Sequence, residues 1–125
     1  MIYADTDFFL ALLKDSDWLK TSAKRLLHIH KNEIRTSPVT LIELLLVSAQ
    51  FYIDPERLIA DALELAQIQG GEVTPILIAA HYIKSKGIGV FDSLHAAFCG
   101  TEEKIISSDK VFDSLGLHRI PIESS

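Results

Sequence analysis

Several features common in other protein classes are scarce in this chain. It has one cysteine, Cys99, so an internal disulfide cannot form, and in the run AAFCG we expect the thiol to behave as a small buried apolar group. Its apolar runs are broken well before the ~20 residues that a membrane span needs. The N-terminal segment reaches Asp5 and Asp7 with no basic region before an apolar run, so we expect no signal peptide. These absences predict a reduced, soluble, cytoplasmic protein.

Basic residues are also few. The chain has 12 Lys and Arg against 17 Asp and Glu, a net charge of -5 and a pI of about 5.4. This balance argues against a protein that binds nucleic acid mainly through a basic surface, although an enzyme with an acidic, metal-recruiting pocket is compatible with it. Basic residues gather between Lys20 and Lys31 and at Lys84 and Lys86. A solvated helix face explains such groups simply, and a rim that steers phosphate is the more specific alternative.

The residues that are present suffice for one substantial core. Of the 125 residues, 48% are hydrophobic, which is too apolar for a disordered chain. We see no internal repeat, low-complexity segment or linker, and the length is typical of one domain. The sequence therefore predicts a single domain over residues 1–125.

Short apolar strands separated by helices dominate the pattern. Start signals for helices stand at Ser37-Pro38 and Asp54-Pro55, and glycines follow several of the predicted helix ends. We expect strands at Ile2–Ala4, Ile34–Thr36, Lys104–Ser107 and Arg119–Ile122. We expect helices at Phe8–Leu13, Asp17 to about His30, Pro38 to about Gln50, Pro55 to about Ile68, Pro75–Lys86, Asp92–Cys99 and Lys110–Leu115. This order indicates an α/β layered fold with a parallel sheet and a high share of helix.

Four acidic residues stand where predicted elements begin or end, inside otherwise apolar or small-residue stretches. They are Asp5 in IYADTD, Glu43 in TLIELLL, Asp92 in GVFDSLHAA and Asp109 in IISSDKVFD. A carboxylate that loses water without a partner costs free energy. A chain that places several of them at element ends has usually gathered them around a cation, so the sequence predicts an acidic metal site.

The position of these acids along the chain favours a common location. Asp5 directly follows one predicted strand and Asp109 follows another after one residue, so both reach the carboxyl edge of a parallel sheet, where ligands bind. Asp92 lies in the first turn of a helix, and helix starts face the same edge. Glu43 has no Lys or Arg at helical spacing to pair with.

A simpler explanation exists for each acid taken alone. Asp5, Asp92 and Asp109 are suited to capping the helices that follow them, and Glu43 can belong to a narrow polar stripe with Thr40 and Gln50. The joint occurrence of four acids at one predicted edge favours the metal site over four separate structural roles.

In order and spacing, these segments resemble the PIN domain family and, within it, the VapC-like toxin ribonucleases of prokaryotic toxin–antitoxin pairs. The resemblance begins with IYADTDFFLALL, continues through SPVTLIELL and FDSLHAAFC, and ends with IISSDKVFD. It covers nearly the whole chain. No single motif is specific, and the match depends on their order, spacing and total length.

The resemblance implies a three-layer α/β/α sandwich with a short central parallel sheet and many helices. It also implies one acidic pocket that binds Mg²⁺ or Mn²⁺ and cleaves RNA. Carried over to this chain, the catalytic and metal-binding acids are Asp5, Glu43, Asp92 and Asp109. The supporting residues are Thr6 and Ser107, which match hydroxyl positions of the family, with Asp113 as a further carboxylate.

Two other polar residues lie close to these motifs. Asp7 is an acid that the family pattern does not require, and we expect it to be a helix-start residue. His95 lies three residues after Asp92, within reach of the pocket rim. A histidine packed inside a helix is the more ordinary arrangement, so no catalytic role is assigned to it.

The implied chemistry is hydrolysis of a phosphodiester bond. Oxygen-only ligands suit Mg²⁺ or Mn²⁺ better than zinc, and a bound ion lowers the pKa of a water that attacks in line. The expected products carry 5′-phosphate and 3′-hydroxyl ends. The resemblance also implies a homodimer that an antitoxin protein holds inactive.

Three other readings compete with this one. Asp5-Thr6-Asp7 has the Asp-x-Asp form of haloacid dehalogenase phosphatases, but their downstream lysine motif is not evident. A receiver domain would need Asp54 as the phosphorylated residue, whereas Asp54-Pro55 reads as a helix start. A PIN-fold module that binds RNA or protein without cleaving it is the alternative from a different functional class.

Overall fold

Five short parallel strands form one sheet in the computed structural model, which describes residues 1–124. The spatial order is β3-β2-β1-β4-β5, and every neighbouring pair is parallel. The central strand β1 pairs with β2 through Ile2 and Ile34 and with β4 through Ala4 and Ile106. The strands are β1 (Ile2–Ala4), β2 (Ile34–Thr36), β3 (Gln67–Ile68), β4 (Lys104–Ser107) and β5 (His118–Pro121).

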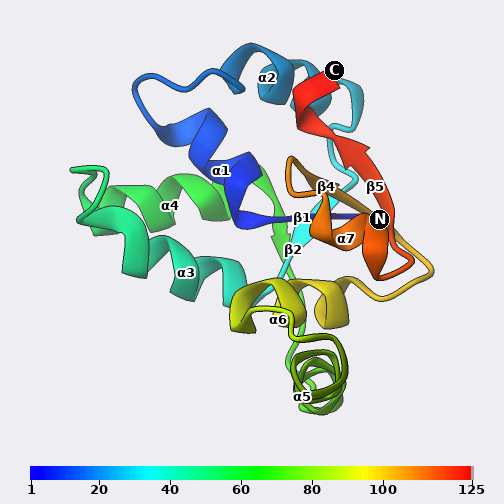
Figure 1. Cartoon of the computed structure of the whole chain (residues 1–125). Coiled ribbons are helices and arrows are strands. Elements are labelled where there is room, and N and C mark those ends of the chain that lie inside the picture. The colour runs from blue at the N-terminus through cyan, green and yellow to red at the C-terminus, as the bar shows by residue number, and fades with distance from the viewer. Residues whose placement is uncertain (125) are drawn as a thin grey trace.

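Helices connect the strands and make up most of the regular structure (Figure 1). They are α1 (Thr6–Leu13), α2 (Lys20–Ile29), α3 (Pro38–Ser48), α4 (Pro55–Leu65), α5 (Thr74–Lys86), α6 (Val90–Cys99), α7 (Val111–Ser114) and the 3₁₀ turn η1 (Ile122–Ser124). None of the helices in the described part of the chain is both long enough and apolar enough to cross a bilayer.

The alternation of side chains along the strands divides the core into two layers. Ile2 and Ala4 of β1 and Ile106 of β4 face a cluster built with α1, α2 and α4. Tyr3 and Ile105, which lie between them in sequence, face the opposite cluster built with α6 and α7. Because successive side chains of a strand point to opposite faces, three residues of β1 suffice to contact both layers. The fold is thus the expected α/β/α arrangement.

The helix α3 is placed differently from the others. It follows β2 directly and contacts α1 and α4 on one side and α6 on the other. It therefore spans the carboxyl edge of the sheet, where α1 and α6 also begin near the strand ends (Figure 1). This position brings one face of α3 toward the ends of β1 and β4.

One predicted element is wrong in part. The sequence predicts a helix up to Ile68, whereas α4 ends at Leu65 and Gln67–Ile68 form the edge strand β3. Ala66 has an extended backbone, with φ -151° and ψ 157°, and Gln69 donates from its backbone N–H to the Thr36 carbonyl over 2.8 Å. The apolar spacing of this segment fits a helix, and a two-residue strand is too short to show an alternating pattern.

A buried arginine ties the sheet to α6. Arg35 of β2 donates through Nη2 to the carbonyls of Phe98 and Cys99, over 3.1 and 3.0 Å, at the end of α6. Its Nε pairs with Glu103 at 3.1 Å. The last carbonyls of a helix have no partner within the helix. This side chain therefore supplies donors to acceptors that would otherwise be buried without a hydrogen bond.

We therefore expect Arg35→Met to lower the free energy of unfolding by about 3 kcal/mol, since the variant leaves the carbonyls of Phe98 and Cys99 without their donor and removes one of the two cations that pair with Glu103. Urea denaturation followed by circular dichroism measures this loss. The matched control is Arg57→Met on α4, whose exposed pair with Asp61 spans 3.7 Å and should contribute less than about 1 kcal/mol. Equal small losses in both variants would contradict the proposed role of Arg35.

Candidate metal centre

An acidic pocket opens at the carboxyl edge of the sheet. Its volume is about 600 Å³. The lining residues are Asp5, Thr6, Asp7, Leu10, Glu43, Val47, Asp92, Ser108, Asp109 and Lys110. They come from α1, α3, α6 and the segment between β4 and α7, so the four acids that the sequence singled out do meet in one place. Asp7 is a fifth acid in the same pocket.

Asp5 is the most buried of these acids and lies at the junction of β1 and α1. Its side chain is 8% exposed. Oδ1 accepts the Thr6 backbone N–H over 2.6 Å and so caps α1, and Oδ2 accepts the hydroxyl of Ser107 over 2.9 Å. Asp5 is therefore a helix cap, as the simpler explanation suggests, and a pocket-lining acid at the same time.

Glu43 reaches the pocket from α3 and meets a histidine there. Its Oε1 lies 2.8 Å from Nε2 of His95, which is on α6. The same nitrogen lies 3.3 Å from Oδ1 of Asp5 and 3.1 Å from the hydroxyl oxygen of Thr6. His95 thus stands between two of the acids, with its side chain only 1% exposed.

The other ring nitrogen of His95 is held from the opposite side. Nδ1 lies 2.8 Å from the hydroxyl oxygen of Tyr3, which in turn lies 2.7 Å from the hydroxyl oxygen of Ser37. Tyr3 comes from β1 and Ser37 precedes α3. A continuous buried chain of hydrogen bonds therefore fixes the orientation of the imidazole relative to the acids.

Asp92 and Asp109 are more open to solvent. Asp92 lies in the first turn of α6, where it is half-buried, and Asp109 is exposed before α7. Oδ1 of Asp109 accepts the Val111 backbone N–H over 3.0 Å, so this acid also caps a turn. Among the residues that the structure describes, the potential ligand atoms of Asp5, Glu43 and His95 alone form a group of three within 4.8 Å of one another.

Asp7 connects the start of α1 to the loop after β4. Its Oδ2 accepts hydrogen bonds from the backbone N–H of Ser108 over 2.8 Å and from the Ser108 hydroxyl. Its Oδ1 is buried and has no hydrogen-bond partner in the described part of the chain. Asp7 is a helix-start residue as expected, but it also fixes the loop that carries Asp109.

The electrostatics reflect acids held together away from water. Burial raises the pKa of Asp5 to about 7, although the charge of His95 opposes this shift. Burial and the nearby charge of Asp109 raise the pKa of Asp92 to about 6. Burial disfavours the charged ring of His95, but the charge of Asp5 and the hydrogen bonds that the ring donates to Glu43 and Tyr3 outweigh it and raise its pKa to about 10. Imidazolium therefore partly neutralises the pocket.

These residues fit a divalent cation. Carboxylate oxygens are the ligands that Mg²⁺ and Mn²⁺ favour, and the pocket holds five such groups. Oδ1 of Asp7 is a buried acceptor with no hydrogen-bond partner in the described part of the chain, and burial raises the pKa values of Asp5 and Asp92. An added cation would neutralise these groups.

The supporting residues expected from the sequence divide into two groups. Thr6 and Ser107 lie at the site, where their hydroxyls contact His95 and Asp5. Asp113 is not brought to the pocket, because it lies on α7 and pairs with Arg119 at 3.2 Å. Sequence reasoning gave His95 no role. Its spacing of one helical turn from Asp92 was visible in the sequence, but a packed histidine explained that spacing equally well, and its contacts with Glu43 and Asp5 depend on distant segments.

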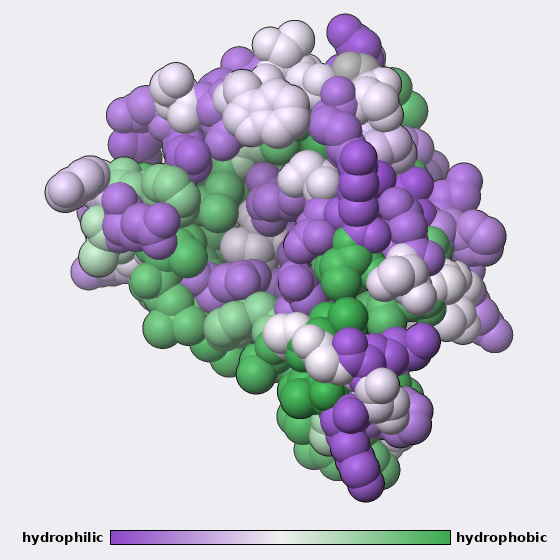
Figure 2. All heavy atoms as spheres, in the orientation of Figure 1, coloured by the Kyte–Doolittle hydropathy of each residue, from purple (hydrophilic) through white to green (hydrophobic). Residues whose placement is uncertain are grey.

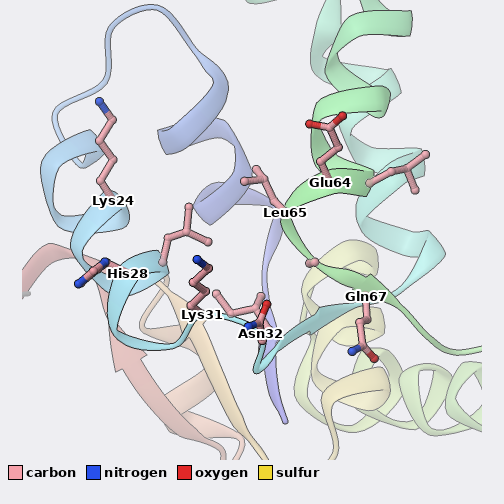
Figure 3. Close-up of a pocket in the computed structure, with 11 residues that line it drawn as sticks. Lys24, His28, Lys31, Asn32, Glu64, Leu65 and Gln67 are labelled. Atoms are coloured by element: carbon pink, nitrogen blue, oxygen red, sulfur yellow. The ribbon is translucent and has the colours of Figure 1, made fainter.

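A second pocket, of about 680 Å³, lies at the opposite edge of the sheet. Lys24 and His28 of α2 and the following Lys31 line one side, and Glu64 of α4 lies across from them (Figure 3). Ile34 and Gln67, the first residues of β2 and β3, also line it, which places it at the amino ends of the strands. This basic group is therefore not a rim of the acidic pocket.

Comparison with known proteins identifies the family. A sequence model described as the PIN domain matches residues 2–116. The chain belongs to the PIN domain family. The expected resemblance is thereby confirmed for nearly the whole length of this PIN domain. No curated protein matches the sequence at a significant level.

Solved structures share the PIN fold of this chain. A toxin–antitoxin complex from Klebsiella pneumoniae has a TM-score of 0.75 at 13% identity, covering 98% of each chain. VapC20 of Mycobacterium tuberculosis, described as a toxin that cleaves the sarcin–ricin loop, has a TM-score of 0.77 at 18% identity, covering 94% of this chain and 96% of that one. VapBC2 of Rickettsia felis, bound to a promoter DNA fragment, gives 0.74 at 19% identity, covering 97% and 98%. At these identities the likeness concerns the fold.

The shifted pKa values of the PIN domain's pocket predict how its stability depends on pH. Asp5 and Asp92 have folded-state pKa values above their ordinary 3.8, and that of His95 lies above its ordinary 6.5. In each case the folded state binds the proton more tightly, so the stabilising contribution is complete at low pH. It is lost as the pH rises through the folded-state value.

We therefore expect the free energy of unfolding of the metal-free protein to fall more steeply between about pH 5 and about pH 8 than that of Asp5→Asn. Chemical denaturation in EDTA across this range measures both slopes. Mn²⁺ or Mg²⁺ should restore stability to the wild type mainly at the upper end of the range, where the acids are ionised. Parallel slopes for the two proteins would show that Asp5 is not the titrating group.

Proposed function

We propose that this PIN domain is a metal-dependent endoribonuclease that acts as the toxin of a toxin–antitoxin pair. The observation that carries the proposal is the gathering of Asp5, Asp7, Glu43, Asp92 and Asp109 in one pocket at the carboxyl edge of the sheet. These acids come from four separate segments, and burial raises the pKa values of Asp5, Asp7 and Asp92. Both features favour a site built for cations over a set of unrelated helix caps.

The proposed roles follow from the position of each acid. Asp5, Glu43, Asp92 and Asp109 would hold Mg²⁺ or Mn²⁺, and Asp7 would keep the loop of Asp109 in place through Ser108. When bound, such an ion would lower the pKa of a coordinated water and neutralise negative charge on a phosphodiester. Ser107 orients Asp5 by its hydrogen bond of 2.9 Å, and Lys110 lines the pocket and offers a positive charge to a phosphate.

RNA is the proposed substrate and an antitoxin the proposed partner. Support comes from the family and from solved structures of the same fold, one described as a toxin that cleaves the sarcin–ricin loop and another as a toxin–antitoxin complex. An enzyme that cleaves cellular RNA would act in the cytoplasm, with residues 1–125 as one functional domain.

A non-catalytic PIN module is the second candidate. The contact of His95 with both Asp5 and Glu43 favours it, because an imidazolium already stabilises these two carboxylates without any metal. Such a module would bind RNA or a protein partner and leave phosphodiester bonds intact. The two candidates therefore differ in a single measurable property, which is cleavage.

We expect the purified protein to cleave a mixed RNA substrate when Mn²⁺ or Mg²⁺ is present, and EDTA to abolish the cleavage. Asp5→Asn and Asp92→Asn should each lower the rate by at least about 100-fold, since each removes a charge that holds the ion or a reacting phosphate. Gel analysis of end-labelled RNA measures the rates, and the products should carry 5′-phosphate ends.

Asp113→Asn is the matched control for this experiment, because Asp113 lies outside the pocket in a pair with Arg119. It should keep the wild-type rate. Full activity in folded Asp5→Asn would refute the assignment of the site. Tight binding of RNA without any cleavage would favour the non-catalytic module.

We further propose that the chain forms a homodimer through an apolar face on α3 and α5. Large apolar side chains are unusually exposed there, including Leu46 at 65% and Leu77 at 74%. Figure 2 shows hydrophobic surface over these two helices. Because contiguous apolar patches of this kind mark interaction sites, a second copy of the chain is the occupant that we expect.

Leu46→Glu and Leu77→Glu should each shift the protein toward monomer, because a carboxylate buried in an apolar interface costs free energy. Light scattering after size-exclusion chromatography measures the mass. Leu63→Glu is the control, since Leu63 is 52% exposed on α4 and lines the second pocket. A wild type that is monomeric at all concentrations would contradict the proposed dimer.

A further inference from the structure

The sequence suggests a metal site with oxygen ligands only, but the structure adds a histidine to it. The residue places a ring nitrogen among the carboxylates, 2.8 Å from Oε1 of Glu43 and 3.3 Å from Oδ1 of Asp5. These three residues are also the group whose potential ligand atoms lie within 4.8 Å of one another. The question is whether the imidazole serves only as a clamp between two acids or is a ligand itself.

The distances from Nε2 of His95 to the two carboxylate oxygens match the spacing of neighbouring ligands around a cation. Neighbouring ligands of an octahedral ion with bonds of about 2.1 Å lie about 3 Å apart. The distances from Nε2 to the two carboxylate oxygens are close to this value, and the Thr6 hydroxyl oxygen lies at a similar 3.1 Å from Nε2. Nε2 therefore lies at ligand spacing from both carboxylate oxygens, and all three donor atoms lie within 4.8 Å of one another.

The surroundings of His95 are also those of a metal-ligating histidine. Such residues usually donate their other ring N–H to a fixed acceptor, which sets the tautomer and the ring orientation. Here Nδ1 is 2.8 Å from the Tyr3 hydroxyl oxygen. That hydroxyl can in turn donate a hydrogen bond to the Ser37 hydroxyl oxygen, 2.7 Å away. Nε2 is the nitrogen that faces the acids; without a cation it donates its hydrogen to Glu43, and with Nδ1 as donor it would present a lone pair once that hydrogen is lost.

We infer that His95 is a direct ligand of the metal ion, through Nε2, together with Asp5 and Glu43. With an ion bound, Nε2 would be deprotonated, with its proton lost to solvent, and the charge of the ion would replace that of the imidazolium between the two carboxylates. A mixed nitrogen and oxygen donor set suits a first-row transition ion such as Mn²⁺ better than Mg²⁺. The inference deepens the proposed function and rests on it, since it names the class of metal that the site prefers.

The decisive experiment uses the full chain with Mn²⁺ alone as the probe. Pulsed electron paramagnetic resonance of bound Mn²⁺ should show coupling to an imidazole nitrogen, and the signal should change when histidine is labelled with ¹⁵N. No substitution is needed, so failure of a variant to fold cannot obscure the result. Mn²⁺ that binds without nitrogen coupling would overturn the inference and leave the proposed nuclease standing. Failure to bind Mn²⁺ at all would overturn both.

Variants then identify the ligand. His95→Gln should abolish the nitrogen coupling and weaken Mn²⁺ binding by about 10- to 100-fold, with a much smaller effect on Mg²⁺ binding. Tyr3→Phe should keep the coupling but weaken Mn²⁺ binding, because the ring loses the partner of Nδ1. His81→Gln is the matched control, since His81 lies exposed on α5 beside Ser85, and it should change neither signal nor affinity. Equal losses of Mn²⁺ and Mg²⁺ affinity in His95→Gln would overturn the metal preference.

Discussion

The cost of keeping several carboxylates together at a sheet edge governs this structure. Asp5 is almost fully buried, and the surrounding chain stabilises it with a backbone N–H, the Ser107 hydroxyl and the charge of His95. Each of these contacts comes from a different segment. The acid therefore holds the start of α1, the end of β4 and the middle of α6 in register, and the pocket forms only where all three meet. The carboxylate oxygens of Asp5 that hold these segments together are thus also pocket-lining atoms.

Much of this arrangement could be predicted from local sequence. Strands as short as IYA and KIIS are recognisable because they are apolar and precede polar residues, and parallel pairing then places Asp5 and Asp109 at one edge. Glu43 was identifiable because a helix with almost no other charge carries it. These features depend on neighbours in sequence and on one general rule of α/β folds.

What could not be predicted depends on contacts between distant segments. His95 meets Tyr3, 92 residues away, and Glu43, 52 residues away, and no local pattern records either contact. The same is true of Asp7 and Ser108, which are 101 residues apart, and of Asp113, which pairs with Arg119 of β5. The edge strand β3 was missed because its two residues gain their conformation from pairing with β2 and carry no signal of their own.

The pairing of β1 with β4 has a consequence for the protein during its synthesis. Ile2 lies opposite Lys104 and Ala4 opposite Ile106, so β1 can pair with β4 only after the 102 residues that separate the partners have been made. Such long-range contacts form late in folding. A chain that ends before Lys104 lacks β4 and Asp109, and with them part of the acidic pocket. An incomplete chain of this kind therefore lacks one of the acids that are proposed to hold the ion.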